Sequence, residues 1–571
     1  MIKINKIYSE PYTFEPVEFK SGINLILGEK DNSSNKTNGV GKSLLIEFIN
    51  FGLMKEYKRS RLSKIPKDDF SENTYVCLDF SIDKNHILSK RRISSESTPT
   101  LYINGIRKDF TSLEDVNKFL TVLMFKNTKS KVHPSFRNML GPLIRDERSE
   151  FKSIIDCHDT KARIPPDYTS HLYFFGISIE LYKKIKEINK NISTLSTAKN
   201  KIKSDIESIT GKKLSSARSE VNDLNFQIKI IKQEMDLLEG DKTFDMVRDE
   251  IASYEDSLDN LRNKKAILKS ELNKIQLLVG DNYIDEDEVV ELYNKLKSGL
   301  GDSIGKELAD VLGFKKKIDD FQRVLIESRK ETILKDLHNI EFSINKFSTQ
   351  LHSKTSILKQ NGHLRNIKTL FIAYEKKLEE LSQLSIFIKK YDDYESETKS
   401  QKAQKAIKLL ELDIDILNQE KTISEFRETI FSIHEYVMEN RKCSFDISAN
   451  DKSEIINFDL RIFDDGSHSN EREKVFIYDM SLLLTDETFT NHPKLLIHDN
   501  IFDVDRDTLI KSLNYLSTKS SCLKDSQYIL TLNIDKLEEI KKDELKLDIH
   551  EYKRVTLTKS NRFLGRQYQE K

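Results

Sequence analysis

The sequence predicts an α/β head that is assembled from the two ends of the chain, with a long antiparallel α-helical coiled coil inserted between them. Apolar runs typical of buried strands occur near both ends of the chain, and a seven-residue apolar repeat occupies its middle. Charged residues make up 33% of the 571 residues, and hydrophobic residues only 37%. This balance favours long solvent-exposed helices over a set of compact globular domains.

The two ends of the chain carry the strand patterns. In the first region, residues 1–177, Ile23–Leu27 predicts a buried strand, and "SLLIEFINFGL" after it has the spacing of a helix. Further strands are predicted around a hairpin turn at Asn104–Gly105. The last region, residues 441–571, contains the strand patterns "IINFDLRIF", "HPKLLIHDN" and "SQYILTLNI". We expect the two regions to join into one head.

The middle of the chain has apolar residues at alternating steps of four and three, which is typical of a coiled coil. An ascending arm is predicted over residues 178–279, where the repeat begins with Leu181 and Ile185, and a descending arm over 326–440. Glycines between the arms predict an apex or elbow over 280–325. At 1.5 Å per residue the arms would form a rod on the order of 150 Å, or a shorter one if the elbow folds. Because the repeat is interrupted, a helical bundle is the alternative.

A phosphate-binding loop is predicted where the first buried strand leads into its helix. The glycines of "TNGVGKS" let backbone N–H groups approach phosphate oxygens, at a helix N-terminus that favours negative charge. We expect Lys42 to reach the β and γ phosphates and Ser43 to contact Mg²⁺. Lys36 stands where the usual pattern has its first glycine, so residues 29–36 are interpreted as a polar insertion. The predicted nucleotide-binding residues are Thr37, Asn38, Gly39, Val40, Gly41, Lys42 and Ser43.

A second strand pattern supplies a carboxylate for the metal. The segment "KLLIHDN" is an apolar run that ends in Asp499, which suits a strand that holds Mg²⁺ through water. Such a run is common by itself, but its combination with a phosphate-binding loop across a coiled coil is specific. ATP and Mg²⁺ are therefore the predicted cofactors, and Ser43 and Asp499 are the predicted metal-binding residues.

These features together resemble the SMC-like ABC ATPases, in which two halves of a P-loop ATPase head are joined by an antiparallel coiled coil. The stretched phosphate-binding loop and the segments "LIHDNIFD", "SFR" and "IRDE" look more closely like the YydD-like bacterial branch. That branch resembles the ATPase subunits of Lamassu-type three-component anti-phage defence systems. The resemblance implies an ABC-type head that dimerises with a second copy, binds DNA and senses foreign or damaged DNA. It also implies a nuclease-type effector and accessory subunits encoded in the same operon.

Several positions depart from the ABC pattern. Asn500 stands where a glutamate usually polarises the attacking water, and an amide cannot act as a general base. Asp503 is interpreted either as a substitute for that glutamate or as part of a dimer-facing loop. Thr531 and Asn533 occupy the segment where a switch histidine is expected. The signature-like segment before "KLLIHDN" lacks a Gly-Gly pair, and its candidate residues are Ser467, Ser469 and Asn470. These departures predict slow hydrolysis, or ATP that serves mainly to clamp two heads together.

The charge and the cysteine content indicate which cellular environment the protein occupies. The formal net charge is zero, so DNA contact would depend on local basic stretches, of which the candidates are Lys55–Lys67, Lys90–Arg92 and Lys126–Arg137. The four cysteines form no C-x-x-C pair, and no apolar run approaches the roughly 18 residues that cross a membrane. The sequence therefore predicts a cytoplasmic protein that does not associate with a membrane.

Two other functions fit the same pattern. One is a DNA-repair or recombination ATPase that acts on DNA ends, which needs efficient hydrolysis and is disfavoured by Asn500. The other is a structural bridging protein whose bound nucleotide is nearly static. Steady-state turnover with and without linear DNA distinguishes the three interpretations.

Overall fold

The computed structural model divides the chain into two compact units. The first unit consists of Met1–Asn189 and Ala403–Lys571, so both ends of the chain build it, as the sequence predicts. The second unit is Lys190–Lys402. The five-part division drawn from the sequence stays a prediction. The structure describes residues 1–31, 39–66, 73–93, 98–126, 132–157, 159–162, 164–210, 213–237, 242–281, 308–357, 364–462, 468–538 and 544–566.

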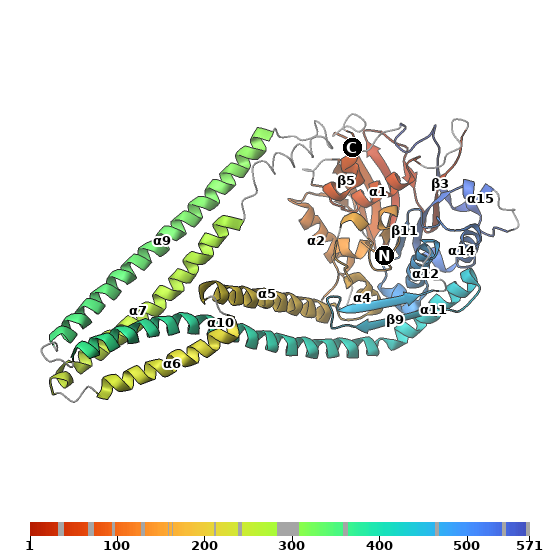
Figure 1. Ribbon diagram of the computed structural model, residues 1–571. Coiled ribbons are helices and arrows are strands. Elements are labelled where there is room, and N and C mark those ends of the chain that lie inside the picture. Colours follow the sequence, from red (N-terminus) through yellow and green to blue (C-terminus); the bar gives the residue numbers. More distant parts are fainter. Residues whose placement is uncertain are drawn as a thin grey trace. The chain divides into compact units, whose positions relative to one another are not determined.

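A parallel sheet in the first unit combines strands from the two ends of the chain (Figure 1). Among the described strands its order is β13–β3–β12–β11–β8. The interior strand β3 is buried along its whole length, because a parallel sheet is covered on both faces. It pairs with β12 so that Gly28 lies opposite Asn533. The strands are β3 (Gly22–Gly28), β8 (Ile144–Arg145), β11 (Leu495–His498), β12 (Gln527–Asn533) and β13 (Lys553–Leu557).

An antiparallel sheet from the N-terminal part has the order β2–β1–β4–β5–β6–β7 among the described strands. The predicted hairpin turn joins β6 to β7, where Asn104 and Gly105 have φ values of 51° and 84°. Asn and Gly tolerate this backbone conformation, so the hairpin prediction is confirmed. The strands are β1 (Ile2–Glu10), β2 (Val17–Glu18), β4 (Tyr75–Ile82), β5 (Asn85–Arg92), β6 (Thr100–Ile103) and β7 (Ile106–Lys108).

An aromatic cluster joins the N-terminal and C-terminal parts of the first unit. The ring of Phe175 lies 4.8 Å from that of Phe426, which in turn lies 5.0 Å from Phe445 and 5.5 Å from Tyr478. The other elements of this unit are α1 (Lys42–Gly52), α2 (Leu113–Met124), α3 (Phe136–Leu140), α4 (Thr169–Phe175), α11 (Glu420–Met438), β9 (Ser444–Ala449), β10 (Ile456–Arg461), α12 (His468–Leu484), α13 (Asp486–Asn491), α14 (Arg506–Thr518), α15 (Asp535–Glu538) and α16 (Ile549–Tyr552).

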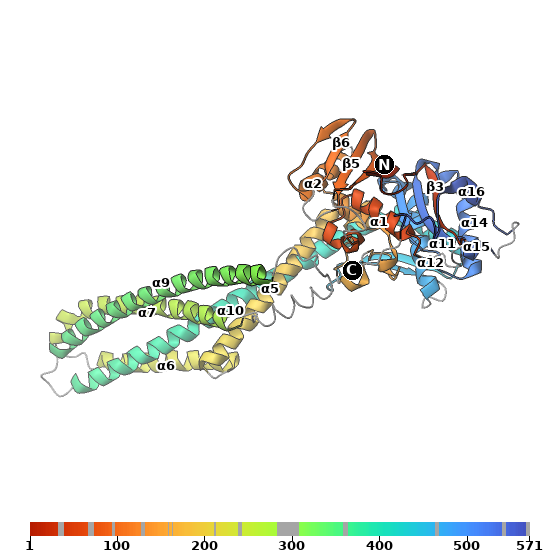
Figure 2. The same cartoon turned by 90° about the horizontal axis from the view of Figure 1, so that it is seen from above.

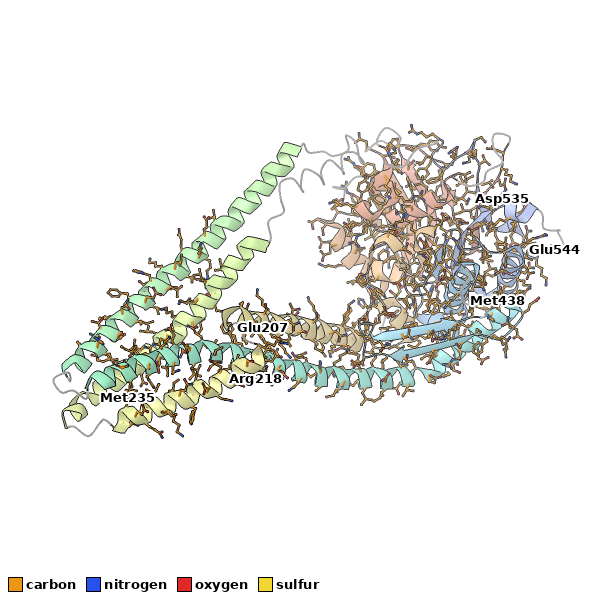
Figure 3. All side chains as sticks on the ribbon, viewed as in Figure 1. Glu207, Arg218, Met235, Met438, Asp535 and Glu544 are labelled. Atoms are coloured by element: carbon orange, nitrogen blue, oxygen red, sulfur yellow. The ribbon has the colours of Figure 1, made fainter. Side chains whose placement is uncertain are left out.

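The second unit is built from long helices, as the apolar repeat predicts (Figures 1 and 2). Its core brings α5, α6 and α10 together through Ile202, Ile206, Leu224 and Leu384. Arg218 of α6, labelled in Figure 3, forms an ion pair with Asp392 of α10. The helices are α5 (Ile179–Thr210), α6 (Leu214–Leu237), α7 (Lys242–Asp281), α9 (Leu308–Ile357) and α10 (Leu364–Asn418), of which α5 begins and α10 ends in the first unit.

Within this unit the predicted arms pair antiparallel and also fold back. Helices α7 and α9 lie side by side in both views (Figures 1 and 2), and Arg329 of α9 pairs with Glu271 of α7. Arg262 of α7 donates to Glu375 of α10 at 2.8 Å, so α7 also packs against the helix that contacts α6. A single extended rod is therefore replaced by a folded one. The predicted glycine-bearing centre lies mostly outside the described residues.

Among the described helices, we find no segment with the length and apolar character that a membrane-spanning helix requires.

Candidate nucleotide-binding site

The phosphate-binding loop predicted from the sequence lies at the carboxyl edge of the parallel sheet, between β3 and α1. Gly39 and Gly41 have φ values of 73° and 107°, in the left-handed region that favours glycine. A Cβ atom added to Gly41 would lie 2.6 Å from Cβ of Phe563, so this position has no space for a side chain. Thr37 and Asn38, also predicted to bind nucleotide, lie outside the described residues.

Lys42 points along the same edge toward the end of β12. Its Nζ donates to Oδ1 of Asn533 at 2.5 Å, and both residues are buried. Burial lowers the pKa of Lys42, while the carboxylates of Asp499, Asp535 and Glu147 act in the opposite direction. Asp535 lies two residues after the end of β12 and is labelled in Figure 3. The lysine is therefore held among polar groups at the strand ends.

Asp499 follows β11 at the same edge and is buried. Its Oδ1 accepts a hydrogen bond of 2.8 Å from Thr531 Oγ1 on β12. Its Oδ2 is also buried and receives no hydrogen bond of ordinary length from the residues that the structure describes. Burial raises the pKa of Asp499 to about 6, and the hydroxyls of Ser43 and Thr531 partly oppose this shift by stabilising the carboxylate.

These groups fit Mg²⁺ and a bound triphosphate. Mg²⁺ prefers oxygen ligands and keeps several waters, and the Ser43 hydroxyl and the carboxylate of Asp499 supply such ligands. Among the described residues no group of three or more His, Cys, Asp or Glu side chains forms a metal site by itself.

Asn500, next along the chain, has three hydrogen bonds that fix its position. Its backbone N–H donates to Thr531 Oγ1 at 2.8 Å, and its carbonyl accepts from Arg472 Nη1 of α12 at 2.6 Å. Its side-chain Nδ2 donates to Oε1 of Glu147 at 3.2 Å. Its φ of 61° is one that asparagine tolerates better than most residues. The amide therefore faces a carboxylate from a different strand.

Strand β8 places two carboxylates beside Asp499 and Asn500. Arg145 of β8 lies opposite His498 of β11 in parallel register, so the residues that follow each strand are neighbours. Asp146 caps the 3₁₀ turn Glu147–Ser149 by accepting a hydrogen bond from Arg148 N. Sequence reasoning noted "IRDE" only as a resemblance and missed its place in the site. The pairing of β8 with β11 is needed to find it.

A buried ionic network positions the two strands. Arg145 donates to both oxygens of Asp479 on α12, at 2.5 and 2.9 Å. His498 Nε2 lies 3.0 Å from the same carboxylate, and its Nδ1 lies 3.0 Å from the hydroxyl of Tyr528 on β12. Because Arg145 is charged, it lowers the pKa of Asp479 against the effect of burial. The network links β8, β11, β12 and α12 beneath the candidate site.

The other predicted site residues occupy more peripheral positions. Asp503 accepts a 2.6 Å hydrogen bond from Lys536 Nζ, which lowers the pKa of Asp503. Ser469 and Asn470 lie in the first turn of α12. Ser467 lies outside the described residues, as does the side chain of Ser469. The signature-like role of these three residues and the catalytic role of Asp503 stay predictions.

The C-terminal segment after β13 packs on the phosphate-binding loop, which the sequence did not predict. Phe563 N donates to the carbonyl of Val40 at 3.1 Å. A Cβ atom added to Gly39 would lie 3.3 Å from Nζ of Lys559, and the charge of Lys559 lowers the pKa of Lys42. Ser560 N donates to Asp31 Oδ2 at 2.6 Å, near the start of the polar insertion. Lys559 therefore places a second positive charge, in addition to that of Lys42, beside the phosphate-binding loop.

Comparison with known proteins places most of this C-terminal part in one matching segment. A family model described as "Uncharacterised protein conserved in bacteria (DUF2326)" matches residues 426–568, which include Asp499, Asn533 and Lys559. Over 584 residues, the chain is 24% identical to the "Uncharacterized protein YydD" of Bacillus subtilis (strain 168), and the match covers 90% of each.

Two solved structures are also similar at low identity. One is an Smc head domain with a coiled coil and joint derived from Pyrococcus yayanosii, with 13% identity and a TM-score of 0.36 over 94% of this chain and 92% of that chain. The other is an Smc head domain with an extended coiled coil, bound to the C-terminal domain of ScpA, derived from Pyrococcus furiosus. It has 13% identity and a TM-score of 0.32 over 94% of this chain and 91% of that chain.

Proposed function

We propose that the protein binds ATP and Mg²⁺ at the carboxyl edge of its parallel sheet and acts as an SMC-like ATPase whose heads dimerise. One observation carries the proposal. The glycine loop before α1 and the buried Asp499 lie on the same edge, and Lys42 reaches the intervening strand end at Asn533. Ligands of open parallel sheets bind outside the carboxyl ends of the strands.

The residues at this edge have separate roles in the proposal. The backbone N–H groups of the loop and the N-terminus of the 11-residue helix α1 favour phosphate. Lys42 supplies a positive charge for the β and γ phosphates, and Ser43 and Asp499 hold the metal. When bound, Mg²⁺ neutralises phosphate charge. Thr531 fixes the carboxylate of Asp499 and the backbone of Asn500 in one arrangement.

Dimerisation through the heads is proposed from the position of α12. Asn470 lies in the first turn of this helix, and Arg472, two residues on, contacts the carbonyl of Asn500. In the proposed dimer, the nucleotide bound by one head would lie near α12 of the second copy. Residues of that helix could then contact the γ-phosphate. Size-exclusion chromatography with light scattering tests this: MgATP should shift the protein from monomer to dimer, and Lys42→Ala should remain monomeric.

DNA binding is proposed from the convergence of two predicted basic stretches and part of a third. One cavity of the first unit is lined by residues from all three, among them Lys58, Arg91 and Arg137. Arg91 is 2% exposed, and burial together with the charge of Arg137 lowers its pKa to about 9. Its Nε makes no hydrogen bond within the described residues. Acidic residues such as Glu114, Asp146 and Asp156 also line this cavity, so a phosphate would contact only its basic part, beside Arg91 and Arg137.

The biological role follows from the family resemblance. We propose that the protein senses foreign or damaged DNA in anti-phage defence and controls a nuclease-type effector, with accessory subunits from the same operon. Purification of the tagged protein from its native operon tests this role. The proposal predicts that a nuclease-type subunit copurifies; a protein that elutes alone at physiological salt would contradict it.

Nucleotide titration followed by kinetics tests the ATPase proposal. We expect saturable binding of a fluorescent ATP analogue in the presence of Mg²⁺, slow single-turnover hydrolysis, and stimulation by linear DNA. Fast DNA-stimulated turnover would favour the repair ATPase, and binding without any hydrolysis would favour the static bridging protein. Absence of nucleotide binding to the folded wild-type protein would overturn the proposal.

A further inference from the structure

We propose that Glu147, at the end of β8, is the general base that accepts the proton of the attacking water, in place of the residue that follows Asp499. This inference rests on the proposed ATP-binding function. The residue that follows the metal-binding aspartate is Asn500, whose amide cannot accept a proton. In space, however, that amide donates to Glu147 Oε1 at 3.2 Å. The carboxylate missing from one strand end is therefore supplied by the neighbouring strand.

The position of Glu147 follows from the register of the sheet. His498 of β11 lies opposite Arg145 of β8, so the two residues after each strand emerge at the same edge. Asp499 N donates to the carbonyl of Arg145 at 2.9 Å, which continues the pairing to the point where the carboxylates begin. The bidentate contact of Arg145 with Asp479 fixes β8 from below. Glu147 thus lies two residues after a short buried strand whose position is fixed by backbone pairing.

Electrostatic coupling places Glu147 within range of the phosphate-binding groups. Its negative charge raises the pKa of Lys42, and it also raises that of Asp499. Both effects decline with distance, so Glu147 shares the local field of the lysine and the metal-binding carboxylate. Glu147 itself is exposed, which leaves it accessible to water and to a second head.

Three other carboxylates described at this edge are less suited to accept a proton. Asp499 is buried and is needed for the metal. Asp503 is paired with Lys536 at 2.6 Å, which stabilises its charged form. Asp146 is engaged by its neighbours, because it accepts a hydrogen bond from Arg148 N and Lys55 Nζ lies 4.0 Å from its Oδ2. Glu147 is exposed, accepts a hydrogen bond from Asn500, and is the first residue of the 3₁₀ turn.

The proposed step is an in-line displacement by water. The water oxygen forms a bond to Pγ while the bond from Pγ to the β,γ-bridging oxygen breaks, and ADP leaves with that electron pair. The proton released by the water passes to the Glu147 carboxylate. Asn500 acts as a positioning residue, because its Nδ2–H donor orients the carboxylate of Glu147.

Glu147→Gln tests the inference, with Glu150→Gln as the matched control. Glu150 is also exposed and lies three residues on, where it pairs with Lys152. We expect Glu147→Gln to bind the fluorescent ATP analogue with wild-type affinity, to lose about 100-fold in single-turnover hydrolysis, and to accumulate an ATP-bound head dimer by light scattering. The control should match wild type in all three measurements.

A double variant tests whether a carboxylate at position 500 can replace that of Glu147. Asn500→Glu restores the usual carboxylate, so Glu147→Gln combined with Asn500→Glu should regain hydrolysis that the single variant lacks. Hydrolysis at the wild-type rate by Glu147→Gln, with normal folding and affinity, would overturn the inference. Failure of wild type to bind nucleotide would instead overturn the proposed function, and the titration reveals this before any rate is measured.

Discussion

Strands β8 and β11 are parallel neighbours, yet they come from opposite ends of the chain and end in different chemistry. β11 is followed by the buried Asp499 and the amide of Asn500, whereas β8 is followed by Asp146 and the exposed Glu147. The carboxylate proposed to bind the metal and the carboxylate proposed to accept the proton therefore follow different strands. If the proposal holds, the two groups of a catalytic pair come from opposite ends of the chain and still meet at one edge of the sheet.

The same division extends to the phosphate-binding groups. The N-terminal part supplies the glycine loop and Lys42, and the C-terminal part supplies Asn533 and Lys559. Neither part forms a complete site, because β3 lies between β13 and β12 in the sheet. Variants in the N-terminal part and variants in the C-terminal part should therefore impair nucleotide binding in distinguishable ways.

Lys42→Ala should have the largest effect, because it removes the positive charge that faces the phosphates on the N-terminal side. We expect the Kd for MgATP to rise by about 100-fold or more, equivalent to roughly 2.8 kcal/mol. Isothermal titration calorimetry measures the change, and Lys6→Ala is the control, since Lys6 pairs with Glu18 at the surface. If the Lys42 variant binds MgATP as tightly as wild type does, the loop is not part of the binding site.

Asp499→Asn should uncouple nucleotide binding from the metal. Its carboxylate has a pKa raised from 3.8 to about 6, so ionisation destabilises the free protein as pH rises through this range. We expect the variant to melt at a higher temperature than wild type at pH 8 without ligand, with no gain at pH 3.5. We also expect Mg²⁺ to stop improving ATP affinity, a loss of about 10- to 100-fold. A variant that keeps the Mg²⁺ effect would exclude Asp499 as a metal-binding residue.

Lys559→Ala tests whether the C-terminal segment takes part in phosphate binding. Its Nζ stands over Gly39, so its removal should raise the Kd for MgATP by about tenfold, with ADP affected less than ATP if the contact is to the γ-phosphate. Lys553→Ala, an exposed position on β13, is the matched control. If both variants bind as tightly as wild type, Lys559 packs on the loop without contacting the ligand.

Glu473→Gln should have the smallest effect on nucleotide binding, because its effect is limited to stability. Glu473 is buried in α12, accepts from Ser512 Oγ at 3.2 Å, and has a pKa raised by burial from 4.5 to about 8. The folded state keeps its proton longer than the unfolded state, so this contribution is fully present below pH 4.5 and is lost as pH rises toward 8. The melting temperature of the variant should therefore change less than that of wild type between pH 5 and 8. Identical pH profiles for the two proteins would show that Glu473 does not titrate in this range.

Much of the head could be predicted from the sequence because local patterns decide it. The run Ile23–Leu27 is buried as β3, and Asn104–Gly105 forms the hairpin turn between β6 and β7, since apolar runs and left-handed turn residues are local signals. Asp499 was recognisable by its place after an apolar run. Thr531 and Asn533 were noted only as departures, and their contacts with Asp499 and Lys42 depend on the order of the strands.

Features that depend on long-range pairing could not be predicted. Glu147 joins the site through a two-residue strand whose partner lies more than 300 residues away in the chain. Lys559 reaches the loop because β13 pairs with the far side of β3. The contact between Arg262 and Glu375 folds α7 against α10, and an apolar repeat does not specify which helices pair.

The most direct test is a crystal structure with a non-hydrolysable ATP analogue and Mg²⁺. We predict that the triphosphate lies along the backbone of Gly39–Ser43, that the metal lies between Ser43 and Asp499, and that Glu147 faces the γ-phosphate. Nucleotide bound elsewhere, or no nucleotide at this edge at saturating concentration, would contradict the assignment of this site.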